Sequence, residues 1–420
     1  MAPAAGWGWR PGIGTATVLL VASLFAAWLF TPTWSGERGV DAKVFYAAAS
    51  LQNRGGNPYD PAQIGAEQDR LFNIPAHLAP GQAGYARAPF GYPPLFTLVL
   101  RGALPLGFDR FYLALLALLL AAGVVGFEAV LRVAGWQRRW LARALFLASA
   151  PMALSLFVGN PSPLLLLGWA AALLLARRGR PFVGGVVLTL CMLKLPVGVP
   201  AAAALLIAPA NGRRLLLAFG LAAGSGVLAS IQVLLTGPEA TANWIRSLGG
   251  YASGIRGGSA FSQSGLAGVP ALFLDYVSTL LAVILGLVLV AAILFWAWRR
   301  LGGSGQAIAP NLYLAIILVA SLGATPYLHL NDLVLMAFPL LLLAQSKPTL
   351  LGRVTELAWF IGIPVRLLVL AVASVALKLH PEAGAAGIGL VLLLLLLVAL
   401  PLVSTSGRPA GAMPAPKPVS

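Results

Sequence analysis

Apolar runs of about 20 residues, separated by short polar or basic segments, occupy most of the chain. A helix of that length matches the roughly 30 Å core of a bilayer and gives every backbone group a partner there. Runs such as "LLALLLAAGVVG" and "LVLLLLLLVAL" lack the alternation that a membrane β-barrel strand would show. The pattern therefore predicts an all-α, polytopic membrane protein.

Two of the runs depart from simple spans. Residues 94–106, "PLFTLVLRGALPL", are too short to cross and contain Arg101, so we expect an interfacial or re-entrant helix there. Residues 182–210 are flanked by the basic segments "RRGR" and "NGRR", which favours a hairpin broken at "KLP". The other spans, about 12 in total with this hairpin, are expected near residues 13–30, 108–134, 144–158, 162–176, 214–236, 271–298, 308–324, 331–346, 356–377 and 383–404.

Composition and charge agree with this map and orient it. The chain is 59% hydrophobic and 10% charged, with a net charge of +16. Its basic residues form short clusters between apolar runs, which is the positive-inside signature and argues against a nucleic-acid partner. Both termini are then cytoplasmic, a single transmembrane domain covers 1–404, and 405–420 form a disordered cytoplasmic tail. Outward segments fall at 32–107, 159–162, 237–270, 325–330 and 378–382.

The acidic residues concentrate in the first outward segment. Five of the 12 lie within residues 32–93, namely Glu37, Asp41, Asp60, Glu67 and Asp69. Asp41 opens "DAKVFYAAASLQNRG", in which Val44, Phe45, Ala48 and Leu51 recur at helical spacing. This spacing predicts a short interfacial amphipathic helix. Asp41 is then either the N-cap of that helix or a carboxylate placed to accept a proton, and the two roles are compatible.

Polar residues elsewhere offer further candidates, each with a simpler alternative. Lys194, among apolar residues at a helix break, would bind an anion or extend its amine to the interface. His329 in "TPYLHLND" would move protons or contact phosphate, or be inert. The glycine-rich residues 244–268 carry Arg246, Arg256 and Gln263, and would cradle a phosphate or sugar, or simply be mobile. The single cysteine, Cys191, suits packing.

Several short motifs follow one another in a fixed order along the chain, and the order is more informative than any single motif. "DAKVFYAAASLQNRGGNPYD" is followed by "YPPLF", "GNPSPLLLL", "LKLPVGVPAAAALL", "GLAGVPALF" and "TPYLHLNDLVLMAFPLLLL". No one motif is highly specific, but the ordered set resembles glycosyltransferase family 87 over roughly residues 15–346. The resemblance implies the GT-C fold and a polyprenyl-phosphate-sugar-dependent transferase, as in mannosyl- and arabinofuranosyltransferases.

The resemblance also implies roles for particular residues. Asp41 matches the position of a general base, and Lys194, His329 and Arg256 are expected at the donor phosphate. "YPP" is part of the family pattern, whereas "SQS" at 262–264 departs from the usual Asn-Gln-Ser, which puts Gln263 in doubt. The expected substrate-binding residues are Tyr46, Tyr92, Asn160, Gln263, Asn331 and Asp332.

The expected activity is transfer of a sugar, mannose or arabinofuranose, from a polyprenyl-phosphate donor to a glycolipid or polysaccharide hydroxyl. It would proceed with inversion at the outer face of a bacterial plasma membrane. No cofactor is expected, and no ligand cluster demands a metal, although metal use stays open. The alternatives are a lipid or solute transporter without bond chemistry and a non-catalytic scaffold. A transporter would favour charges near the bilayer midplane, whereas the acids here cluster at the interface.

Overall fold

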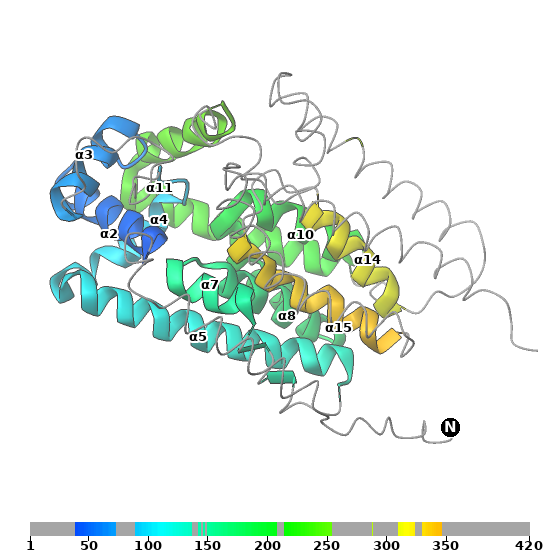
Figure 1. Cartoon of the computed structure of the whole chain (residues 1–420). Helices are drawn as coiled ribbons and strands as arrows, with labels where there is room; N and C mark the ends of the chain where they lie inside the picture. Colours follow the sequence, from blue (N-terminus) through cyan, green and yellow to red (C-terminus); the bar gives the residue numbers. More distant parts are fainter. Residues whose placement is uncertain are drawn as a thin grey trace, which may run out of the picture.

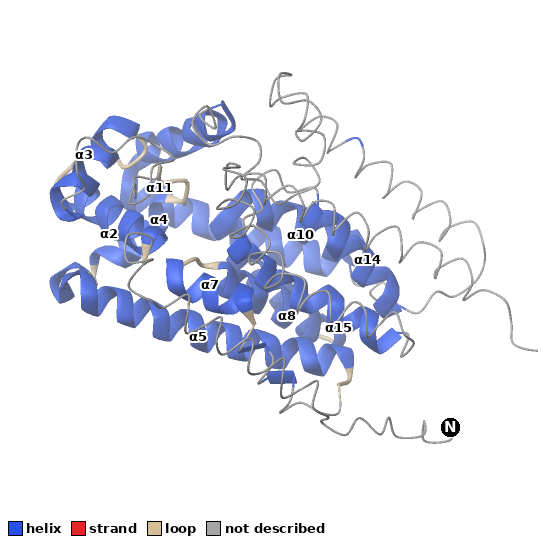
Figure 2. Ribbon diagram, viewed as in Figure 1, coloured by secondary structure: helices blue, strands red, loops and turns tan. Residues whose placement is uncertain are grey.

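The computed structural model describes residues 38–72, 89–136, 142–143, 146–147, 149–207, 214–253, 288, 310–323 and 330–346. Across these ranges all regular secondary structure is helical (Figure 2). The expected first span, the spans near 271–298, 356–377 and 383–404, and the expected tail lie outside the described residues. The all-helical class is confirmed for the described part, and the total of about 12 spans stays a prediction.

Within the described ranges, three helices are long and apolar enough to cross a membrane, judged by length and composition. They are Leu104–Ala134, Pro181–Val199 and Arg214–Leu248, and shorter apolar helices cover Ser162–Arg177 and Asn331–Leu342. Large apolar side chains on their surfaces are exposed, as at Leu113, Phe182 and Leu234. A bilayer provides the apolar surroundings that such side chains need, so these helices indicate a membrane protein.

The first described helices gather at one end of the molecule (Figure 1). They are α2 (Val40–Asn53), α3 (Pro61–Phe72) and α4 (Pro94–Arg101). The short η2 (Leu104–Leu106) leads into α5 (Gly107–Ala134), which runs along one side of the bundle from that end. The four apolar positions that predicted α2 from the sequence are all buried in it, which confirms this helix.

The remaining described helices complete the bundle, some packed directly against α5 and the others against one another (Figure 1). In chain order they are α7 (Ala150–Val158), α8 (Ser162–Arg177), α9 (Pro181–Leu188), η3 (Thr189–Lys194), α10 (Leu195–Ile207), α11 (Arg214–Ser253), α14 (Pro310–Gly323), η5 (Leu330–Met336) and α15 (Ala337–Ser346). Glycine allows a close contact between α5 and α8. A Cβ on Gly126 would lie 2.8 Å from the backbone nitrogen of Leu167.

The segment 94–106 does not form a span. Helix α4 has eight residues, which gives a length of about 12 Å, far less than the bilayer core. Pro94 starts it, where the missing N–H costs no hydrogen bond. Arg101 at its end donates from Nε to Asn53 Oδ1 at 3.1 Å, which ties α4 to the end of α2. The expectation of a short, non-spanning helix agrees with this geometry.

The helix that follows α9 changes type at the expected break. Residues 189–194 form the 3₁₀ helix η3 before α10 begins at Leu195. A Cβ on Gly198 would lie 1.7 Å from the carbonyl oxygen of Cys191, so the start of α10 lies against η3 with no room for a side chain at this position. The run Pro181–Val199 has the length and composition of a span, and its helix changes from 3₁₀ to α at "KLP", while the expected hairpin stays a prediction.

Helix α11 corrects one expectation. Its chain kinks at Gly237, whose φ of 82° favours glycine, and Pro238 begins a second helical stretch that reaches Ser253. Residues 244–253, expected to belong to a glycine-rich loop, are therefore helical. A long-range contact supports this stretch, because Trp244 Nε1 donates to the carbonyl of Gly91 at 3.2 Å. The glycine pattern carried no signal of that contact.

Candidate functional site

Asp41 lies in the first turn of α2 but does not cap it. Gly39 occupies the N-cap position with a φ of 67°, and no side chain completes the cap. The Gly39 N–H donates instead to the carbonyl of Phe157 at 2.8 Å, which holds the start of α2 on the end of α7. The interpretation of Asp41 as a helix cap is therefore wrong, and its carboxylate is available for other contacts.

The turn between α7 and α8 meets Asp41. Gly159, with a φ of 79°, brings this turn so close to α2 that an added Cβ would lie 2.9 Å from the Cβ of Ala42. Asn160 follows it and donates from Nδ2 to Asp41 Oδ2 at 2.7 Å. Its Oδ1 accepts the backbone N–H of Ser162 at 3.0 Å, which fixes the amide with its donor toward Asp41.

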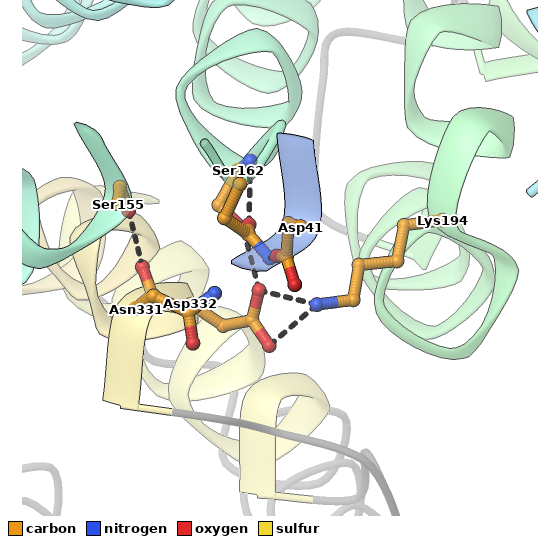
Figure 3. Close-up of polar contacts among 7 residues, drawn as sticks. Asp41, Ser155, Ser162, Lys194, Asn331 and Asp332 are labelled. Atoms are coloured by element: carbon orange, nitrogen blue, oxygen red, sulfur yellow. Dashed lines mark hydrogen bonds and ion pairs between the residues drawn. The ribbon is translucent and has the colours of Figure 1, made fainter. Parts of the chain in front are cut away.

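Asp332 and Lys194 form an ion pair beside this turn (Figure 3). Lys194 Nζ lies 2.6 and 2.7 Å from the two carboxylate oxygens of Asp332. The Asp332 side chain is fully buried and that of Lys194 is 11% exposed. Because a buried charge is costly without a partner, each of these residues requires the other.

Ser162 joins the two halves of the site. Its Oγ lies 2.6 Å from Asn160 Oδ1 and also contacts Asp332 Oδ1. One hydroxyl proton serves one acceptor at a time, and an ionised carboxylate is the stronger acceptor. Ser162 therefore donates to Asp332, and a continuous polar chain runs from Asp41 through Asn160 and Ser162 to Asp332 and Lys194. We call these five residues the polar network.

Four separate segments of the chain supply the polar network. Asp41 comes from α2, Asn160 and Ser162 from the turn before α8 and its first residue, Lys194 from the end of η3, and Asp332 from η5. A further contact positions η5, because Ser155 Oγ on α7 donates to the carbonyl of Asn331 at 2.7 Å (Figure 3). Neighbouring side chains point toward one another in this view, so the network is a tertiary assembly.

The surroundings of Asp41 raise its pKa above the ordinary value. Burial of the carboxyl is the largest cause, and the negative charge of Asp332 adds to it. The positive charge of Lys194 and the hydrogen bond from Asn160 act in the opposite direction without overcoming burial. Asp41 nevertheless keeps part of its surface exposed, whereas Asp332 is fully enclosed. Of these two aspartates, Asp41 is the more exposed residue.

The two expected substrate-binding tyrosines lie in an aromatic layer around α2. The Tyr46 hydroxyl donates to the carbonyl of Leu104 at 3.2 Å, and its ring packs on Phe111 with 5.3 Å between centroids. The Tyr92 ring meets Phe45 edge-on at 4.8 Å. Both tyrosines thus contribute to packing at the end of the bundle that carries α2.

The other expected site residues divide into three sets. Asp41, Asn160, Lys194 and Asp332 meet in the polar network, and Asn331 adjoins it through its carbonyl. Arg256, Gln263 and His329 lie outside the described residues. Ser162 was missed, and its only signal in the sequence is its place directly after Asn160-Pro161 in "GNPSP". Across the described ranges, no group of three or more His, Cys, Asp or Glu could hold a metal ion.

Apolar helices surround a network of two carboxylates, a lysine and two hydrogen-bonding side chains, so the described residues indicate a helical membrane protein with a charged polar site. The family model for glycosyltransferase family 87 matches residues 90–328, more than half of the chain. The chain therefore belongs to glycosyltransferase family 87, and the family implies a membrane glycosyltransferase. Comparisons with curated proteins and with solved structures find no match. The matched residues include Asn160, Ser162 and Lys194, while Asp41 and Asp332 lie on either side.

Proposed function

We propose that this glycosyltransferase moves a sugar from a polyprenyl-phosphate donor to a hydroxyl of a glycolipid or glycan acceptor, with Asp41 as general base. The proposed reaction takes place at the outer face of a bacterial plasma membrane and inverts the anomeric carbon. The acceptor oxygen bonds to that carbon, its proton passes to Asp41, and the bond to the phosphate oxygen breaks. The polyprenyl phosphate departs with the electron pair.

The observation that carries the proposal is the environment of Asp41. A general base needs a carboxylate that the acceptor proton can reach and a pKa close to the operating pH. Asp41 is partly exposed, and burial raises the pKa of its carboxyl from the ordinary aspartate value. Asn160 fixes one carboxylate oxygen, so the other can be directed at a substrate.

The departing phosphate gains negative charge in the transition state, and nearby cations would stabilise it. Lys194 is the cation that the polar network supplies. Its charge is compensated by Asp332, so the pair alone is close to neutral. The proposal therefore assigns Arg256 and His329 to the phosphate together with Lys194. Tyr46, Tyr92, Gln263 and Asn331 remain proposed substrate contacts, with mannose or arabinofuranose as the sugar.

The test is sugar transfer by the purified full chain in lipid nanodiscs. Radiolabelled polyprenyl-phosphate mannose and arabinose serve as donors, and a membrane lipid extract supplies acceptors. Asp41→Asn should lower transfer by roughly 10²- to 10⁴-fold, the usual contribution of a general base, while donor binding survives.

The matched control is Asp60→Asn on the same stretch of chain. Asp60 is an exposed carboxylate that accepts the Ala62 N–H at 2.8 Å at the start of α3, so this variant should keep its transfer activity. Undiminished transfer by Asp41→Asn would contradict the assignment of the base. Donor binding without transfer, in a preparation known to contain acceptor, would favour a transporter or a binding protein instead.

A further inference from the structure

Asp332, like Ser162, has no exposed surface, which is unusual for a residue expected to bind substrate. Its side chain is fully buried, and both of its oxygens are engaged by Lys194 at 2.6 and 2.7 Å. Ser162 Oγ also donates to one of them. A substrate hydroxyl would have to displace these partners before it could contact the carboxylate.

The position of Asp332 suits a different task. Lys194 extends from the end of η3 on a flexible side chain, and two-oxygen pairing restrains its ammonium group. Ser162 restrains Asp332 in turn, and the backbone of Ser162 is tied to Asn160, the donor to Asp41. The network thus fixes a cation next to the proposed base.

We propose that Asp332 and Ser162 are positioning residues that hold Lys194 beside Asp41 and so couple the charge at the proposed donor phosphate to the protonation of the base. This inference rests on the proposed function for its catalytic meaning, but the coupling itself is a property of the folded chain. Ionised Asp41 is favoured by Lys194 and disfavoured by Asp332, so the two partners act on it with opposite sign.

The charged groups around Asp41 determine how a substitution in the polar network should change the protonation of Asp41. Among the described residues, Lys194 of η3 and Asp332 of η5 are the charged groups that act on its carboxyl. The turn before α8 presents the neutral Asn160 and Ser162. On its own segment Arg38 and Lys43 hold positions over the rings of Tyr112 and Phe72, at 5.4 and 5.9 Å. The Tyr112 hydroxyl of α5 donates to the Phe157 carbonyl at 2.7 Å.

The experiment measures the protonation of Asp41 directly, without relying on activity. Carbodiimide and an amine nucleophile modify protonated carboxyls, and peptide mass spectrometry follows Asp41 in the full chain in nanodiscs as the pH is raised. The pH at which half of Asp41 is modified is the midpoint of the titration. Asp332→Asn should move this midpoint to lower pH, because it removes a negative charge near Asp41 and leaves the positive charge of Lys194 uncompensated. Lys194→Met should move the midpoint to higher pH.

Two further variants keep the test decisive. Lys194→Met with Asp332→Asn removes both charges and leaves no unpaired ion, so it guards against misfolding of the single variants. Its midpoint should lie above that of the wild type, because Lys194 acts on Asp41 more strongly than Asp332 does. Glu67→Gln also removes a buried carboxylate from an ion pair, but on α3, and it should leave the Asp41 midpoint unchanged.

Transfer assays then separate the inference from the proposed function. If the coupling holds, Ser162→Ala should lower kcat at least 10-fold with little change in KM, and Ser162→Thr, which keeps the hydroxyl, should restore most of the rate. If the midpoint for Asp41 modification is the same in Lys194→Met, in Asp332→Asn and in the wild type, the inference is overturned, even if transfer depends on Asp41. Opposite midpoint shifts without any transfer would support the coupling and count against the proposed function.

Discussion

Asn160 Nδ2 donates a hydrogen bond to Asp41 Oδ2 at 2.7 Å across 119 residues of chain. This contact joins the first described helix to the turn that begins α8, and it occupies the carboxylate that the sequence offered as a possible helix cap. It also stabilises the ionised carboxylate, because the amide donates to negative charge. The affinity of Asp41 for a proton is therefore set partly by a residue from another segment.

Substitution at Asn160 should change the pH dependence of transfer. Asn160→Ala removes a donor to the ionised form of Asp41, so the pKa of Asp41 rises further and the ascending limb of the pH profile moves to higher pH. A hydrogen bond to a charged group contributes about 1.5–3 kcal/mol, so transfer at pH values below the midpoint of that limb should fall roughly 10- to 100-fold. Asn160→Asp should move the limb still higher, because it places a second carboxyl beside Asp41. An unshifted limb in both variants would contradict the contact.

Asp41→Asn should make the protein more stable at neutral pH. The pKa of Asp41 is raised on folding, so its carboxyl contributes stability that is complete below the pKa of the unfolded chain. That contribution is lost as the pH rises through the folded-state pKa of Asp41. Asparagine has no proton to lose, so the variant keeps its stability over the same pH range. Apparent melting temperatures in detergent should be higher for Asp41→Asn than for the wild type at neutral pH. The two should converge near pH 4; a lower value for the variant at both pH values would contradict this.

Glu67 should anchor α3 to α2. It is 2% exposed and accepts from Ser50 Oγ at 2.7 Å and from Arg70 Nη2 at 2.8 Å, with Arg54 as a second ion partner. Burial opposes ionisation of Glu67, but these partners lower its pKa overall. The ionised Glu67 side chain therefore stabilises the fold fully at pH values above the ordinary glutamate pKa. This stabilisation is lost as the pH falls through the lowered pKa of the folded state.

Because both arginines are about half exposed, Glu67→Gln should cost only about 1–2 kcal/mol. Hydrogen exchange should show faster exchange in α3 while α8 stays protected. The same substitution at the exposed Glu239 is the control and should leave exchange in α3 unchanged. Equal effects of the two variants on α3 would rule out the anchoring role.

Gly198 should be intolerant of a side chain. An added Cβ would lie 1.7 Å from the Cys191 carbonyl, a backbone atom that cannot move aside cheaply. Gly198→Ala should destabilise by about 3 kcal/mol and displace the neighbouring Lys194, so both stability and transfer fall. Gly226→Ala on α11, where nothing lies within 4 Å of an added Cβ, should keep both. Normal stability of Gly198→Ala would show that α10 does not pack against η3 in this way.

The sequence by itself determined the local features of this protein. Long apolar runs predict membrane helices, the four buried positions of α2 follow helical spacing, and the short segment before α5 could not reach across a bilayer. These features depend on residues within a few turns of one another, so hydropathy and periodicity are enough to find them. The ordered motifs likewise pointed to the family that the family comparison shows.

Only the tertiary structure decided how the polar residues work together. The sequence offered Asp41, Asn160, Lys194 and Asp332 as separate candidates, passed over Ser162, and expected a loop where α11 continues past its kink. Their grouping depends on close packing between distant segments, such as Gly159 against Ala42. Hydrogen bonds and ion pairs act over a few ångströms, and spacing along the chain does not record which distant residues will be brought that close.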